Sequence, residues 1–227
     1  MDGSAPRRVV FIGGLDDGRR AVQVLLEHPR VDLVGVFVLD DEAAGGVAGF
    51  RTFDDLVAPP VLRKVAKVRD HADEIAALRP DLVLVVGFSQ IIPPSILGVP
   101  PLGVIGFHTA VLPGRRGSSP VIWAMIDGLE ESGVTMFFMD EGIDTGPRIV
   151  VRREVDLSRF RSVEAAKGHL FSLDVEMYAE ALARLREPGF SPSPNGPDGR
   201  RHYVMSRLFS GVASRILGCD ASPERLD

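Results

Sequence analysis

The sequence predicts an α/β fold in which helices cover both faces of an open, mainly parallel sheet. Short runs of β-branched and aromatic residues alternate along the chain with segments whose apolar residues recur at helical spacing. One of these runs, residues 82–86, is continuously apolar, as a strand covered on both faces must be. In such a sheet the ligand site belongs at the carboxyl ends of the strands.

The first half of the chain contains most of the expected parallel strands. Gly13 ends the first apolar run, and a helical pattern follows from Ala21 until Pro29 stops it. The acidic and glycine-rich stretch 40–49 has the composition of a surface loop. The other elements expected in this half are strands over 31–39, 61–68 and 82–86 and a helix over 71–78.

The second half is richer in loops, where binding and catalytic residues tend to lie. Ser119 is placed to cap a helix that begins at Pro120 and stops at Gly128. A long amphipathic helix is expected over 163–185, followed by a linker rich in Pro, Gly and Ser. The other expected elements are strands over 103–107, 133–139, 148–155 and 202–205 and a helix over 208–217.

Composition excludes several classes of protein. The chain has 227 residues, which allows one large domain with a small appendage. Its 26 basic and 31 acidic residues give a net charge of −5, so no global field attracts a polyanion. Cys219 is the single cysteine and cannot form an internal disulfide, and no apolar run approaches the length of a membrane span. We therefore expect a cytoplasmic protein without a membrane partner.

Two segments resemble known binding motifs but lack residues that those motifs require. The glycines after the first strand resemble a dinucleotide-binding turn, but Leu15 stands at the middle position, where close approach to a pyrophosphate needs glycine. A tight turn into the helix explains them at least as well. The loop 140–146 lacks a calcium ligand at Gly142, and Val151 stands at its closing position. The five histidines form no close-spaced pair, so no metal site is predicted.

Two residues remain as candidates for chemistry. His108 follows a predicted strand and begins a loop of Pro and Gly, and Asp144 lies between glycines in a later loop. Both stand where the ligand site of an α/β sheet opens. Taken one at a time, each is more often a structural residue, a satisfied histidine or the cap of a turn.

Three segments favour a functional role for these two residues, because together the segments resemble a known family. Residues 106–117 read GFHTAVLPGRRG and continue as SSPVIWA, residues 133–146 read GVTMFFMDEGIDTG, and residues 85–93 read VVGFSQIIP. They resemble the folate-dependent formyltransferases, which include methionyl-tRNA formyltransferase, glycinamide ribonucleotide formyltransferase and the sugar N-formyltransferases. The similarity covers residues 7–155 and includes the glycines after the first strand.

The resemblance implies a Rossmann-like catalytic domain over residues 1–187, with 188–227 as a short C-terminal extension. It implies 10-formyltetrahydrofolate as the donor, an amine as the acceptor and no metal. His108 and Asp144 fall on the family's catalytic histidine and aspartate. Gly106 stands where the family has an asparagine whose amide helps to hold the formyl oxygen.

The resemblance also implies two groups of binding residues. The residues expected at the folate are Phe88, Ser89, Gln90, Ile91 and Ile92 of one loop and Asp140, Glu141 and Gly142 of another. Those expected at the acceptor substrate are Gly13, Gly14, Arg115, Arg116 and Gly117.

The chemistry explains why these residue types are wanted. An amine attacks the formyl carbon, the formyl oxygen gains negative charge, and the amine must lose a proton before the folate nitrogen leaves. An imidazole suits both tasks near neutral pH, and a carboxylate beside it can fix its tautomer. Because Gly106 has no side chain, we expect a small polar void there, which a water or an exposed backbone N–H fills.

The acceptor is expected to be a small molecule, in particular a nucleotide-linked amino sugar. The segment after residue 187 is short and the chain is acidic, so no tRNA partner is expected, and a homodimer stays open. Two alternatives also stay open: a formyltetrahydrofolate hydrolase, which releases formate without an amine, and a catalytically impaired folate- or nucleotide-binding protein, because Gly106 replaces the asparagine.

Overall fold

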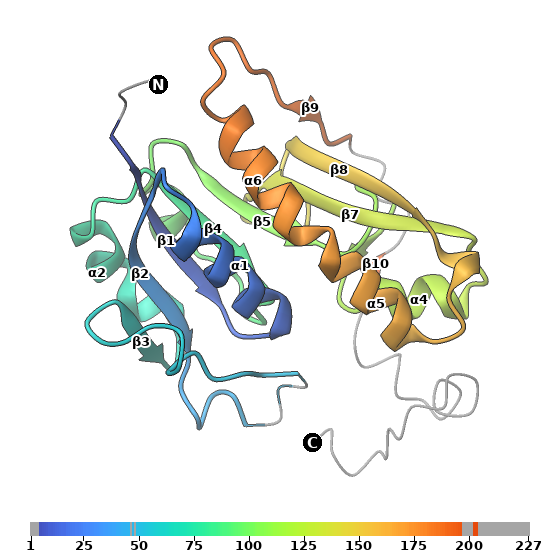
Figure 1. Ribbon diagram of the computed structural model, residues 1–227, viewed down its shortest axis with the longest axis horizontal. Coiled ribbons are helices and arrows are strands. Elements are labelled where there is room, and N and C mark those ends of the chain that lie inside the picture. Colours follow the sequence, from blue (N-terminus) through green and yellow to red (C-terminus); the bar gives the residue numbers. More distant parts are fainter. Residues whose placement is uncertain (1–4, 46, 48, 197–201, 204–227) are drawn as a thin grey trace.

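The computed structural model describes residues 5–45, 47, 49–196 and 202–203. Within them, eight strands form one sheet in the order β3-β2-β1-β4-β5-β7-β8-β9 (Figure 1). The strands from β3 to β5 are parallel, and β7, β8 and β9 extend the sheet antiparallel. Their bounds are β1 Arg7–Gly13, β2 Val31–Leu39, β3 Leu62–Val65, β4 Leu82–Val86, β5 Val104–His108, β7 Glu131–Phe138, β8 Arg148–Asp156 and β9 Ser193–Pro194.

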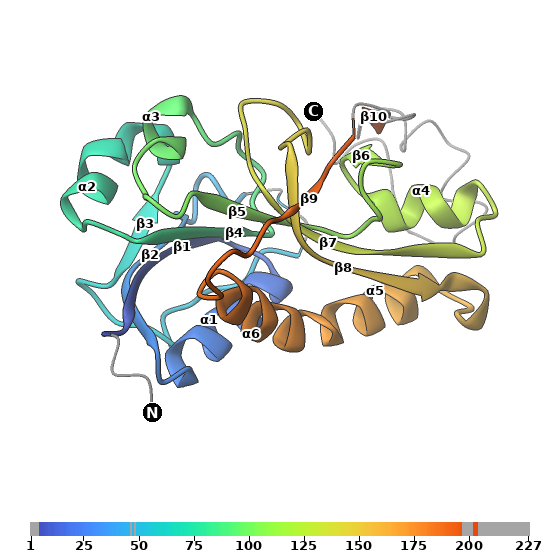
Figure 2. The same cartoon turned by 90° about the horizontal axis from the view of Figure 1, so that it is seen from above.

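Helices cover both faces of this sheet. Figure 2 shows α1, α5 and α6 on one face and α2 and α3 on the other, and α4 packs against β7 and α5. The helix bounds are α1 Asp16–Glu27, α2 Ala72–Ala77, α3 Pro94–Leu97, α4 Pro120–Ile126, α5 Val163–Ser172 and α6 Asp174–Arg184. The expected α/β fold with a mainly parallel open sheet is therefore confirmed, with an antiparallel edge added.

Each face of the sheet has its own hydrophobic core. The larger core joins α1, α5 and α6 to the sheet through residues such as Leu25, Leu170 and Tyr178. The smaller core joins α2 and α3 through Ile75 and Ile96. Strand order reverses between β1 and β4, so the crevice that such sheets use for ligands opens beyond these strand ends.

Several elements differ from the sequence prediction. The expected third strand is shorter: it ends at Val65, and a 3-10 turn, Val68–His71, begins at the last residue of the expected strand. The expected long helix is divided into α5 and α6 at Leu173, whose N–H bonds to Leu170 O, three residues back. The short elements α3, β6 (Arg116–Gly117) and β9 were not predicted.

The cap of α4 also differs from the prediction. Ser119 occupies the N-cap position with a φ of 56°, in the left-handed region, and its side chain makes no capping hydrogen bond. The extended backbone that lets a serine cap a helix is absent there. Pro120 does stand at the first helical turn, as expected.

The segment after α6 contributes to the main sheet. β9 pairs antiparallel with β8, and β10 (His202–Tyr203) pairs parallel with β6. Part of the strand expected over 202–205 is thus described, whereas the helix expected over 208–217 lies outside the described residues. None of the described helices combines the length and apolar character needed to cross a membrane.

Candidate active site

His108 is the last residue of β5 and lies at the carboxyl end of the parallel strands. Its side chain is buried, and Nε2 lies 2.9 Å from the carbonyl oxygen of Arg115. Because a carbonyl oxygen only accepts hydrogen bonds, Nε2 must carry the hydrogen in this contact. The other ring nitrogen, Nδ1, faces Asp144.

Asp144 reaches His108 from the loop between β7 and β8. Its Oδ2 lies 3.5 Å from His108 Nδ1 and accepts a hydrogen bond of 2.8 Å from the backbone N–H of Gly117. The backbone of Asp144 has a φ of 53°, which is rare for a residue with a side chain and is held only where the surroundings enforce it. The two residues expected to carry the chemistry therefore lie side by side.

The loop that carries Asp144 is built by its own residues. Asp140 Oδ1 accepts hydrogen bonds from the N–H of Gly142 at 3.0 Å and from the hydroxyl of Thr145 at 2.7 Å. At Gly146 a Cβ atom would lie 1.7 Å from the carbonyl oxygen of Phe138, so only glycine fits against this strand end. These contacts explain why the loop returns toward His108.

The void expected at Gly106 is not present. A Cβ atom at this position would lie 2.9 Å from Met139 Cγ, 3.1 Å from Met139 Sδ and 3.3 Å from Phe137 Cε1. Met139 occupies the space that a side chain at residue 106 would use. The backbone does not require glycine through a positive φ either, since Gly106 is not among the residues with that conformation.

The loop 88–92 lies between β4 and α3, on the sheet face that α2 and α3 cover. Gln90 is bound to the chain itself, since its amide accepts from Val68 N at 3.0 Å and donates to Ala66 O at 2.8 Å. Ile92 is buried in the smaller core, with Phe88 and Met139 packed against that core. Ile91 is 66% exposed. This loop thus offers its backbone, the exposed hydroxyl of Ser89 and the exposed apolar side chain of Ile91 to a ligand.

The loop 140–146 offers a similar apolar group. Ile143 is 51% exposed, and it and Ile91 are two of the three large hydrophobic side chains that the described residues expose. Both belong to the loops that the sequence assigned to folate. Each of these side chains offers apolar surface that a bound ring system would cover.

Gly13 and Gly14 are buried at the end of β1. A Cβ atom at Gly13 would lie 2.4 Å from both the Phe11 ring and the carbonyl oxygen of Val86, and the Phe50 ring lies beside Gly14. The close packing of β1 against β4 accounts for Gly13, whereas a Cβ atom at Gly14 would make only ordinary van der Waals contacts, at 3.6 Å or more. Their expected role at the acceptor substrate stays a prediction.

Asp17 is a buried carboxyl group that the sequence analysis did not single out. It lies in the first turn of α1, where its Oδ1 accepts from the N–H of Gly18 at 2.9 Å. A Cβ atom at Gly87 would lie 2.3 Å from the same oxygen, so glycine is required there. Burial raises the pKa of Asp17 above its ordinary value.

The segment 115–117 surrounds His108 and Asp144. Arg115 supplies the carbonyl that contacts His108, and its guanidinium forms an ion pair with Asp127 at 3.0 Å. Arg116 is buried and donates from Nη2 to Gly196 O at 2.8 Å. Gly117 holds the carboxylate of Asp144. Contact of these three residues with the acceptor stays a prediction.

Two further residues at the site were missed. Thr135 of β7 lies opposite His108, and its hydroxyl donates to Ala110 O at 2.7 Å and accepts from Leu112 N at 3.2 Å. Asn195 binds the loop of Asp144. The threonine follows the ordinary strand pattern, and the asparagine stands in a linker-like run of Pro, Ser and Gly, so neither gives a signal in the sequence.

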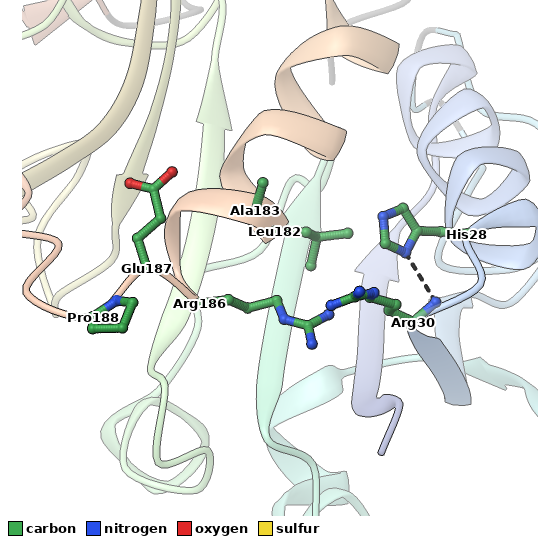
Figure 3. Close-up of a pocket in the computed structure, with 7 residues that line it drawn as sticks. All are labelled: His28, Arg30, Leu182, Ala183, Arg186, Glu187 and Pro188. Carbon is green, nitrogen blue, oxygen red and sulfur yellow. Dashed lines mark hydrogen bonds between the residues drawn. The ribbon is translucent and has the colours of Figure 1, made fainter. Parts of the chain in front are cut away.

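A cavity of about 410 Å³ lies elsewhere on the molecule, between the end of α1 and the end of α6 (Figure 3). His28, Arg30, Arg186 and Glu187 line it together with apolar residues. Arg30 immediately precedes β2, so this cavity opens at the amino ends of the parallel strands, away from His108. Among the described residues, no three His, Cys, Asp or Glu side chains are grouped to hold a metal ion.

Comparison with known proteins agrees with this geometry. Residues 9–182 match the family model described as formyl transferase, and the match includes β5, β7 and the loop of Asp144. The chain belongs to the formyl transferase family. It is 33% identical over 217 residues to a methionyl-tRNA formyltransferase of Clostridioides difficile (strain 630), an alignment covering 93% of this chain and 67% of that protein. Across four such curated relatives the chain spans 52% to 67% of their length.

Two solved structures share the fold. A sugar N-formyltransferase from Shewanella sp. FDAARGOS_354 superposes with a TM-score of 0.68 at 16% identity, covering 89% of this chain and 78% of that one. HypX from Aquifex aeolicus, in complex with tetrahydrofolic acid, gives a TM-score of 0.61 at 22% identity, covering 88% of this chain and 29% of that one.

Proposed function

We propose that this chain transfers the formyl group of 10-formyltetrahydrofolate to an amine of a small acceptor, in particular a nucleotide-linked amino sugar. The observation that carries the proposal is the pairing of His108 Nδ1 with Asp144 Oδ2 at 3.5 Å, at the carboxyl end of β5. The exposed Ile91 and Ile143 support binding of the folate rings between the two loops.

The roles of the residues follow from the bonds that must change. The amine nitrogen forms a bond to the formyl carbon, the carbonyl electrons move to the formyl oxygen, and the bond from that carbon to the folate nitrogen then breaks. Because Nε2 already carries a hydrogen in its contact with Arg115 O, His108 accepts the proton that the amine loses at Nδ1 and returns a proton to the leaving folate nitrogen. Asp144 stabilises the imidazole while it is positively charged, because its carboxylate faces Nδ1.

The charge of the chain supports a small acceptor over a large polyanion. With a net charge of −5, the chain lacks the excess of Lys and Arg that neutralises nucleic-acid phosphates. Methionyl-tRNA is the second candidate acceptor, because the curated relatives at 29% to 38% identity are methionyl-tRNA formyltransferases.

One experiment tests the proposal and separates the candidates. The protein is incubated with 10-formyltetrahydrofolate and either a panel of nucleotide-linked amino sugars, methionyl-tRNA, or no acceptor. Appearance of tetrahydrofolate is followed by absorbance, and the product by its mass. We expect a formylated amino sugar. A formylated methionyl-tRNA alone would overturn the proposed acceptor, and formate released without an acceptor would indicate a hydrolase. No folate turnover under any condition would refute formyl transfer.

A further inference from the structure

Asn195 links the segment after α6 to the loop of Asp144. It follows β9 directly, and its backbone N–H donates to Pro147 O at 2.7 Å. Its side-chain amide donates to Gly146 O at 2.7 Å and lies 3.4 Å from Asp144 O. One residue thus contacts three carbonyl groups in four consecutive positions of the loop.

The side-chain contacts of Asn195 require the NH2 group of its amide, which donates hydrogen bonds. Asn195 is 8% exposed, and its NH2 group faces two carbonyl oxygens that only accept hydrogen bonds. Its Oδ1 is buried without a hydrogen-bond partner among the described residues, which lowers stability. An amide with one unsatisfied end is a poor choice for packing alone, so the position is best explained by what its NH2 group holds.

What the NH2 group holds is the backbone of a strained residue. The left-handed conformation of Asp144 persists only if neighbouring groups fix it. Gly117 N–H fixes the carboxylate and Asn195 fixes the carbonyl side. Together the two contacts determine where Oδ2 lies relative to His108 Nδ1.

The segment of Asn195 is itself tied to the site. Arg116 is buried and donates to Gly196 O, the carbonyl next along the chain. The residues on either side of Arg116 are Arg115, whose carbonyl contacts His108, and Gly117, which holds Asp144. Displacement of 195–196 would therefore act on both members of the catalytic pair.

We propose that Asn195 is a positioning residue for formyl transfer: it sets the orientation of Asp144 and, through it, of His108. The proposal rests on the proposed function for its kinetic part and on the geometry of the pair for its structural part. Misplacement of a catalytic group by about 1 Å can lower turnover about 100-fold without weakening binding. A residue that acts only through position should therefore change kcat much more than KM.

The decisive variant is Asn195→Asp, which keeps the shape of the side chain and replaces the donor by an acceptor that repels both carbonyl groups. We expect kcat to fall at least about tenfold, with the KM values for folate and amine nearly unchanged. Asn195→Gln restores the NH2 group and is expected to recover part of the loss. Ser193→Ala, an exposed position on β9 two residues before Asn195, is the matched control and should behave as the parent chain does.

A second control separates positioning from loss of stability. Ile75→Val lies in the core between α2 and the sheet and destabilises the chain without touching the site. If Ile75→Val lowers kcat as much as Asn195→Asp at a similar loss of Tm, the proposal is overturned. An unchanged kcat in Asn195→Asp overturns it as well.

The structural part of the proposal is tested without measuring turnover, from the NMR resonances of the imidazole nitrogens of His108. They should shift in Asn195→Asp and stay in place in Ser193→Ala and Ile75→Val. Unshifted resonances in Asn195→Asp would overturn the proposal. If the parent chain transfers no formyl group, the proposed function fails, and these resonances still decide whether Asn195 positions the pair.

Discussion

Gly106 and Met139 together allow a direct test of how this site supports the formyl oxygen. The test compares Gly106→Ala with Gly106→Asn. Both add the same Cβ atom, which would lie 2.9 Å from Met139 Cγ and 3.3 Å from Phe137 Cε1. Only the asparagine adds the amide that the family has at this position. The alanine variant therefore reports the effect of the Cβ atom alone, and the difference between the two variants reports the effect of the amide group, including its bulk.

The cost of crowding follows from the contact distances. Adding atoms to a packed interior costs about 1–3 kcal/mol, and replacing a strand glycine returns about 0.5–1 kcal/mol of backbone entropy. Met139 is flexible and can turn away, which keeps the cost near the lower end of that range. We expect Gly106→Ala to lose at most about 0.5 kcal/mol of stability. Gly106→Asn adds more atoms and should lose about 1 kcal/mol, which lowers Tm by about 2–4 °C in a chain of this size.

Turnover then reports on the amide. We expect Gly106→Asn to transfer the formyl group at least as fast as Gly106→Ala. Adding Met139→Ala should raise the rate of the asparagine variant further, because the amide then has room. A single donor to an oxyanion contributes about 100- to 1000-fold to turnover, which sets the upper limit of this gain. Steady-state kinetics with saturating donor and acceptor measure it.

Two results would refute this reasoning. If Gly106→Asn is folded but turns over more than about tenfold slower than Gly106→Ala, a difference of about 1.4 kcal/mol in the barrier, the amide cannot stand beside the formyl oxygen in this chain. If neither variant loses stability, Met139 does not fill the space beside Gly106 as the structure describes.

Three further predictions concern single residues. His108→Gln should lower kcat at least about 100-fold while folate binding, followed by fluorescence, is retained; normal turnover would make His108 structural. Burial raises the pKa of Asp17, so ionisation of this carboxyl group destabilises the folded chain as the pH rises above 3.8. Asp17→Asn should therefore be more stable than the parent chain at neutral pH and equally stable in acid, as measured by urea unfolding. Gly146→Ala should cost at least about 2 kcal/mol, since its Cβ would lie 1.7 Å from Phe138 O, whereas Gly168→Ala, in open space on α5, should stabilise the chain; equal effects would contradict the fit at Gly146.

The parallel strands could be predicted because burial on both faces leaves a continuous apolar run. Residues 82–86 match β4 to the residue for this reason. Residues 31–39 also match β2, although only its last five residues are buried and Asp32 is exposed. β9 could not be predicted, because a strand of two residues, one of them proline, is defined by its pairing with β8 and has no pattern of its own. The same holds for α3, a single turn that begins at a proline.

Residues of the site could be predicted where their position beside a strand already indicates a role. His108 and Asp144 each stand next to a strand end, and the fold brings strand ends together. Asn195 could not be found this way, because its role depends on hydrogen bonds to carbonyl groups of a loop far away in the chain. The filling of the space beside Gly106 also depends on a neighbour, Met139, that no spacing rule connects to it.

Asn195 and Met139 affect the same step of the proposed reaction through different groups of the site. Asn195 holds the backbone carbonyl of Asp144, whose carboxylate faces His108, so in the proposed reaction it belongs to the part of the site that moves protons. Met139 stands where the family's amide would be, and a thioether donates no hydrogen bond. In the proposed reaction, the charge that builds on the formyl oxygen must then be stabilised by His108 or by backbone N–H groups. We therefore expect turnover to depend more strongly on the position of the His–Asp pair in this chain than in a relative with the asparagine.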